Sequence, residues 1–72
     1  MKTVEIFRTD ITQPFIAQKL IESLLELLPN CRINFDLQDC DHILRIESTE
    51  DFCTDTVQAH LQQRGYFAEL LF

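Results

Sequence analysis

The sequence predicts an α+β fold with the element order βαββαβ, in which a four-stranded antiparallel sheet carries two helices on one face. Three observations predict this class. Two segments have apolar residues at helical spacing, and shorter segments with apolar residues at alternate positions flank each of them. Prolines, a polar turn and the single glycine separate these segments. The two halves of the chain therefore repeat one strand–helix–strand pattern, within a length that allows a single domain, residues 1–72.

The first half of the chain predicts a strand over residues 3–8 and then a helix that ends at Pro29. Ile6 and Phe7 break the alternation of the strand, so the pattern leaves open which of the two faces the helices. Pro14 suits the first helical turn, where its missing N–H costs no hydrogen bond. The residues expected to lead into the helix are Asp10 and Thr12, and those expected on its apolar face are Ile16, Leu20, Leu24 and either Leu27 or Leu28.

The second half of the chain predicts a hairpin, a second helix and a last strand. Residues 31–38 alternate between apolar and polar, and the short polar turn QDCD separates them from a strand over residues 42–47. Gly65 ends the second helix, because a left-handed residue is usually needed at that point, and residues 67–72 form the final strand. Candidate caps of this helix are Thr49, Asp51 and Thr54, and its core-facing stripe carries Val57, His60, Leu61 and Arg64.

This order of elements is that of the ferredoxin-like split βαβ arrangement, which leaves one face of the sheet uncovered. In the last two strands, the residues that should face the helices alternate with apolar residues that should face outward. The outward residues are Ile43, Phe67 and Leu71. An apolar cluster on an open sheet is typical of an interface with a protein partner or a second copy, although apolar residues scattered singly are ordinary on a surface.

The chain is acidic, since twelve Asp and Glu against six Lys and Arg give a net charge of −6. The bases are scattered along the sequence, which argues against a nucleic acid partner, because phosphate binding requires clusters of Lys or Arg. The first ten residues lack the apolar run of a signal peptide, and no segment is apolar enough to insert into a membrane. The odd number of cysteines, three, indicates reduced thiols, so we expect a cytoplasmic protein.

The strand HILRIES and the terminal segment RGYFAELL carry a family resemblance. With the order of the elements and the length of the chain, they make the sequence resemble the heavy-metal-associated domains, the family of copper chaperones and of the metal-binding modules of metal-pumping ATPases. The resemblance covers essentially all 72 residues. Gly65, Tyr66 and Ala68 are similar to the family's Gly-aromatic-x-Ala signature.

The metal motif of that family is a Cys-x-x-Cys pair in the loop between the first strand and the first helix, where two thiolates hold a soft ion. When the first helix is laid over this pattern, the two cysteine positions fall on Gln13 and Ile16, with Pro14 and Phe15 between them. Gln is not a soft-metal ligand, and Ile is no ligand at all. We therefore expect neither a metal at these former metal-loop positions nor any cofactor.

Relocated ligands give the alternative. In the predicted topology, the turn over residues 38–41 lies at the same end of the sheet as the start of the first helix, whereas Cys31 and Cys53 lie at the opposite end. At this turn, Cys40 offers a soft ligand and His42 a borderline ligand for Zn²⁺ or Cu⁺. A tight structural zinc site requires four ligands, and this spacing has no second pair of them. The candidate ligands are Cys40, His42, Asp10 and Asp39.

Nothing in the sequence has the spacing of a catalytic site. Cys53 and His60 are seven residues apart on one helix, about 10 Å along its axis, which is too far for a nucleophile and its base. No glycine-rich phosphate loop is present. We therefore expect no enzyme, but a degenerate heavy-metal-associated-like domain that acts as a protein-interaction or regulatory module. The alternative function is soluble heavy-metal (Cu/Zn) binding or transfer through ligands near Cys40 and His42.

Overall fold

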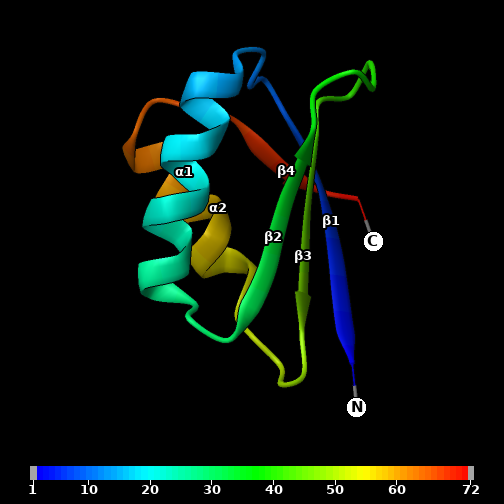
Figure 1. Ribbon diagram of the computed structural model, residues 1–72, viewed down its shortest axis with the longest axis vertical. Coiled ribbons are helices and arrows are strands. Elements are labelled where there is room, and N and C mark those ends of the chain that lie inside the picture. The colour runs from blue at the N-terminus through cyan, green and yellow to red at the C-terminus, as the bar shows by residue number, and fades with distance from the viewer. Residues whose placement is uncertain (1, 72) are drawn as a thin grey trace.

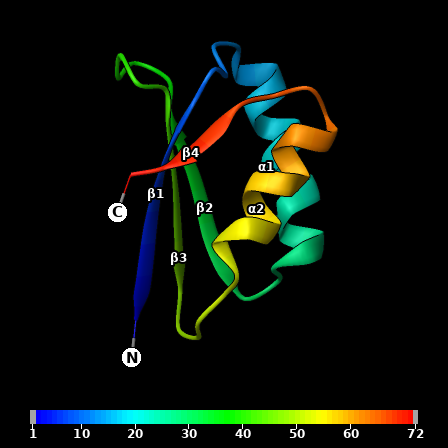
Figure 2. The ribbon, with the colours of Figure 1, turned by 180° about the vertical axis from the view of Figure 1, so that it is seen from behind.

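The structure is a computed structural model, and it describes residues 2–71. It confirms the predicted fold class: both helices cover one face of a four-stranded sheet, and the other face is bare (Figures 1 and 2). The elements are β1 (Thr3–Thr9), α1 (Pro14–Leu27), β2 (Cys31–Asp36), β3 (Ile43–Ser48), α2 (Thr54–Gln63) and β4 (Ala68–Leu70). Within residues 2–71, neither helix has both the length and the apolar character that crossing a membrane requires.

The strands lie in the order β2-β3-β1-β4, and every neighbouring pair is antiparallel. This is the order of the ferredoxin-like arrangement, in which the two middle strands come from different halves of the chain. Right-handed crossovers through α1 and α2 place both helices on the same side. The loop after β1 and the hairpin between β2 and β3 consequently share the upper end of the sheet in Figure 1.

The core fills the space between the sheet and the helices. In β1 the structure decides between the two candidate residues: Phe7 is fully buried and pairs with Leu44 of β3, whereas Ile6 lies on the bare face. At the end of α1 it is Leu28, not Leu27, that packs against the core. The buried apolar residues are Phe7, Ile11, Ala17, Leu20, Leu24, Ile33, Leu44, Ile46, Val57 and Leu61.

Two predicted strands are longer than the observed ones. β2 ends at Asp36, because the Asp36 carboxylate accepts the backbone N–H of Gln38 at 3.2 Å and turns the chain away from the ladder. β4 begins only at Ala68, because the backbone N–H of Phe67 donates to the Asp10 carboxylate at 2.9 Å instead of to a strand. Phe72, the last residue of the predicted strand, lies outside the described residues.

The helix starts also differ from the prediction. Gln13 is the residue before α1 and makes no side-chain cap, so Thr12 and Asp10 do not cap this helix. Pro14 does stand in the first turn, where it preorganises the backbone. Cys53, not Thr49, Asp51 or Thr54, is the residue before α2.

The predicted end of α2 is confirmed. Gly65 has a φ of 86°, the left-handed region that favours glycine. The backbone N–H of Tyr66 donates to the carbonyl of Leu61 at 3.0 Å, and that of Gly65 donates to Gln62 at 3.0 Å. These two bonds satisfy the last carbonyls of the helix and direct the chain into β4.

Candidate functional site

Thr9 joins the two loops at the upper end of the sheet. Its backbone N–H donates to the carbonyl of Asp41 at 3.1 Å, and its hydroxyl donates to the carbonyl of His42 at 2.5 Å. The same hydroxyl oxygen accepts the N–H of Ile11 at 3.2 Å. The prediction that these loops share one end is therefore confirmed, and the buried Thr9 that fixes them together is a residue that the sequence pattern did not single out.

The two positions that were laid over the cysteine pair of the heavy-metal-associated domains, Gln13 and Ile16, carry no metal ligands. Gln13 is exposed at the start of α1, and Ile16 is half-buried against the core. Between them Phe15 is 63% exposed, and its ring lies 5.1 Å from Lys19 Nζ. A cation over the face of an aromatic ring is a favourable contact, so this turn has an aromatic and a positively charged surface where the family has two thiolates.

The candidate relocated ligands are only partly brought together. Ligand atoms of Asp39, Cys40 and Asp41 all lie within 4.8 Å of one another on the hairpin. His42 is not part of this group, and its Nδ1 is buried with no hydrogen-bond partner among residues 2–71. Asp10 is held by the backbone of Phe67. Three successive, largely exposed turn residues are an ordinary polar loop, so the geometry gives the metal alternative no specific support.

The three cysteines are free. Cys31 begins β2 and Cys53 directly precedes α2, so both lie at the end of the sheet opposite the β2–β3 hairpin. Hydrogen bonds to the Cys53 sulfur from the Thr56 hydroxyl and then from the backbone N–H groups of Thr56 and Asp55 lower the pKa of its thiol. A helix start that favours a thiolate is common, and the hydrogen-bond partners of this sulfur within residues 2–71 are a hydroxyl and backbone N–H groups, none of which is a general base. The arrangement stabilises the helix start and does not define an active site.

A serine–histidine contact links the two helices, and the sequence pattern missed it. Ser23 Oγ of α1 lies 2.8 Å from His60 Nε2 of α2, although the residues are 37 positions apart. On its other side, His60 Nδ1 lies 3.4 Å from Arg64 Nη1. Burial of the imidazole, and then the nearby Arg64 charge, lower the pKa of His60.

The directions of these bonds argue against catalysis. Arg64 can only donate, so His60 Nδ1 must accept and Nε2 carries the proton. Nε2–H then donates to Ser23 Oγ, whose own hydroxyl donates to the carbonyl of Leu20 at 3.1 Å. A serine nucleophile needs the opposite polarity, with a carboxylate behind the histidine and an unprotonated nitrogen toward the hydroxyl. The Ser23–His60–Arg64 chain is a tether between the helices.

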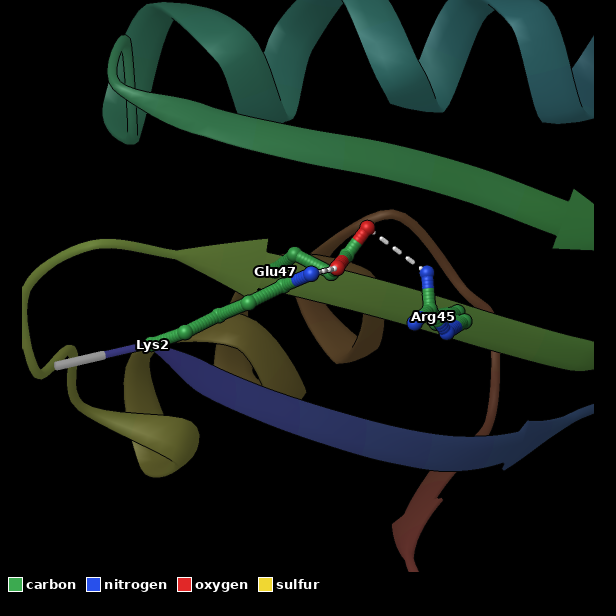
Figure 3. A network of polar contacts seen from close by, with 3 residues as sticks. All are labelled: Lys2, Arg45 and Glu47. Atoms are coloured by element: carbon green, nitrogen blue, oxygen red, sulfur yellow. Dashed lines mark hydrogen bonds and ion pairs between the residues drawn. The ribbon is translucent and has the colours of Figure 1, made fainter.

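The ion pairs found within residues 2–71 lie on the bare face of the sheet, hereafter the open face. The Glu47 carboxylate binds Lys2 Nζ and Arg45 Nη1 at 2.5 and 2.7 Å, and Figure 3 shows it between the two cations. Its side chain is only 10% exposed. The hydrogen bond from Lys2, then that from Arg45, lower the pKa of Glu47 to about 2. The carboxylate is thus ionised throughout the range in which proteins usually work.

Apolar residues lie beside these ion pairs on the same face. Arg8 binds Glu69 at 2.9 Å across β1 and β4, and its guanidinium lies 5.9 Å from the ring of Phe67. Phe67 and Leu71 are 45% and 38% exposed. Ile43 is half-buried and opposite Arg8, on the side of β3 away from the core. All three residues predicted for this surface therefore lie at the open face or its edge, together with Val4 and Ile6.

The open face differs in charge from the rest of the molecule. Four of the six basic residues and three of the twelve acidic residues lie on it, which gives a net charge of +1, while the remaining surface carries −7. The basic residues are Lys2, Arg8, Arg32 and Arg45, and the acidic residues are Asp36, Glu47 and Glu69.

Comparison of this chain with models of protein families, with curated proteins and with solved structures gave no match.

Proposed function

We propose that this chain is a non-enzymatic protein-interaction module, a degenerate heavy-metal-associated-like domain without the family's metal site, and that it binds through its open face. The family assignment is supported by the βαββαβ order and by Gly65, Tyr66 and Ala68 at the end of α2. The loss of metal binding is supported by Gln13 and Ile16 at the positions of the two cysteines. Three free cysteines fit a reducing, cytoplasmic location.

The observation that carries the proposal is an uncovered sheet with apolar residues between ordered ion pairs. Ile6 lies in the middle of the open face on β1, and Leu71 adjoins it because the Leu71 N–H donates to the Ile6 carbonyl at 2.8 Å. Ile43 and Phe67 extend the apolar surface toward the upper end of the sheet. Protein interfaces are enriched in apolar residues and arginine, and this face combines both.

The occupant that the charges favour is a second copy of this chain. The remaining surface is acidic on balance, with a net charge of −7, so a contact between two copies through it is opposed by repulsion between like charges. Two open faces are nearly neutral, and each offers both signs of charge to the other. Arg32 is exposed on the edge strand and makes no ion pair within residues 2–71, so it is free to bind a carboxylate of the second copy.

Sedimentation velocity over a range of protein concentrations tests the proposal. We expect the wild-type chain to form a dimer, and Ile6→Asp to raise the dissociation constant at least about tenfold by placing a charge at the centre of the contact. Phe15→Asp is the matched control, because it makes the same kind of change on the helix side, at a more exposed residue. Circular dichroism establishes that both variants are folded.

A wild-type chain that remains monomeric at the highest concentration contradicts the proposal of a second copy. So does an Ile6→Asp variant that associates as well as Phe15→Asp. Binding of a different protein by the monomer, with the same loss in Ile6→Asp, would keep the open face as the contact surface but replace the occupant.

A further inference from the structure

A groove on the helix side of the molecule takes no part in the contact proposed for the open face. It runs between α1 and the segment that joins α2 to β4, and its volume is about 350 Å³. Small-molecule sites start at about this size. The residues that line it are Ile16, Lys19, Leu20, Ser23, Arg64 and Tyr66.

The groove is positively charged in an acidic molecule. Among residues 2–71 the ion pairs use Lys2, Arg8 and Arg45 as cations, and neither Lys19 nor Arg64 takes part in one. Both of these unpaired cations line this groove, and no Asp or Glu lines it. Two cations without counter-ions at one concave surface create a local potential that attracts anions, although the chain as a whole carries −6.

Arg64 is positioned, not merely exposed. Its Nη1 donates to the carbonyl of His60 at 3.2 Å and to His60 Nδ1 at 3.4 Å, and His60 Nε2 in turn lies 2.8 Å from Ser23 Oγ of α1. The side-chain hydrogen bonds that Arg64 makes within residues 2–71 use only Nη1, so its Nε and Nη2 donors are available to a ligand. The Ser23–His60 contact between the helices therefore also holds the Arg64 guanidinium in place.

Lys19 lines the groove from α1. Its ammonium is 5.1 Å from the centroid of the Phe15 ring, a contact that restrains the side chain, and it makes no ion pair within residues 2–71. The apolar lining consists of Ile16, Leu20 and the ring of Tyr66. The groove therefore combines an apolar floor with two separate donors of positive charge.

We propose that this groove binds a small amphipathic anion. The apolar body of the ligand lies on Ile16, Leu20 and Tyr66, and its carboxylate or phosphate head lies between Lys19 and Arg64. An anion with no apolar body leaves the floor of the groove exposed to water, and a neutral apolar molecule leaves both cations without a partner. The site lies on the helix side, so its occupancy is independent of any contact at the open face.

Two-dimensional ¹H–¹⁵N NMR titration of the full chain tests the proposal, with phenylacetate and phenyl phosphate as probes. The neutral 2-phenylethanol and inorganic phosphate are the comparison compounds. We expect shifts at Ile16, Leu20 and Tyr66, and binding of at least one aromatic anion about tenfold tighter than that of either comparison compound. The preference between the two aromatic anions identifies the head group.

Matched variants separate the site from the overall charge. Lys19→Gln and Arg64→Gln should each weaken binding of the aromatic anion about tenfold, which is the loss of one charge-assisted hydrogen bond. Arg32→Gln removes an equal charge from the open face, where Arg32 makes no ion pair among the described residues, and should leave binding unchanged.

Three results would overturn the proposal. One is equal affinity for phenylacetate, phenyl phosphate and 2-phenylethanol; another is equal weakening by Arg32→Gln and Lys19→Gln; the third is a set of shifts that lies outside the groove. Lys19→Gln keeps the test valid even if Arg64→Gln loosens α2, because the Lys19 ammonium makes no hydrogen bond or ion pair within residues 2–71 and contacts only the Phe15 ring.

Discussion

The Ser23–His60 tether gives the prediction that the structure specifies most fully. Ser23→Ala removes the oxygen that accepts His60 Nε2–H at 2.8 Å and leaves this partly buried N–H without a partner. A neutral hydrogen bond of this kind contributes about 1 kcal/mol to the free energy of unfolding. For a domain of this length, that loss lowers the melting temperature by about 4–8 °C.

The same tether predicts a dependence on pH. The folded-state pKa of His60 is lowered, first by burial and then by Arg64, so the unfolded chain binds a proton more readily than the folded chain. His60 therefore disfavours the folded state as the pH falls from about 6.5, the ordinary value for histidine, toward its folded-state pKa. His60→Gln cannot be protonated and should lose this part of the pH dependence.

Thermal unfolding followed by circular dichroism, at pH 7.5 and pH 5.5, measures both effects. Gln18→Ala is the control on the same helix, because it removes only an exposed contact to Glu22 at 3.5 Å and should change the free energy of unfolding by less than about 0.5 kcal/mol. The reasoning is refuted if Ser23→Ala melts with the wild-type chain, or if His60→Gln leaves the difference between the two pH values unchanged.

Three further predictions concern the open face, the end of α2 and the hairpin. Because the pKa of Glu47 is lowered from 4.5 to about 2, its ion pairs stabilise the fold fully above pH 4.5, and this stabilisation is lost as the pH falls through 2. In denaturant titrations at acid pH, Glu47→Gln should make the free energy of unfolding depend less on pH. An unchanged dependence would exclude the Lys2–Glu47–Arg45 network as its cause. Gly65→Ala should lower the free energy of unfolding by about 1 kcal/mol through backbone strain alone, since a methyl group there meets no atom within 4 Å and φ is 86°; equal stability in a urea titration would contradict the left-handed conformation. Titration with Cu⁺ against a thiol competitor should show no saturable site, whereas micromolar binding that disappears in Cys40→Ala would establish the metal alternative in place of ours.

Local patterns were enough to predict the fold. Each of these patterns depends only on residues near one another in sequence. The alternation predicts that Ile33 and Phe35 face the core, and the helical spacing predicts the same for Leu20 and Leu24; all four pack there. Gly65 adopts the left-handed conformation that was expected at the end of the second helix. The three outward apolar residues Ile43, Phe67 and Leu71 follow from the same alternation, and all lie at the open face or its edge.

The contacts that build the candidate sites depend instead on residues far apart in the chain. Ser23 meets His60 across 37 positions, and Asp10 meets the backbone of Phe67 across 57. No periodicity encodes such pairs, because each results from how two elements pack. Asp10 shows the consequence: its sequence neighbours suggest a helix start or a metal ligand, whereas its carboxylate in fact holds the start of β4.

The open face is the central claim, and the dependence of backbone amide shifts on protein concentration tests it most directly. We predict that ¹H–¹⁵N spectra of the wild-type chain, recorded from dilute to concentrated solution, change at Val4, Ile6, Ile43 and Leu71 and remain constant along the helices. Ile6→Asp should remove the change. Shifts confined to α1 and α2, or spectra independent of concentration, would contradict a second copy on this face.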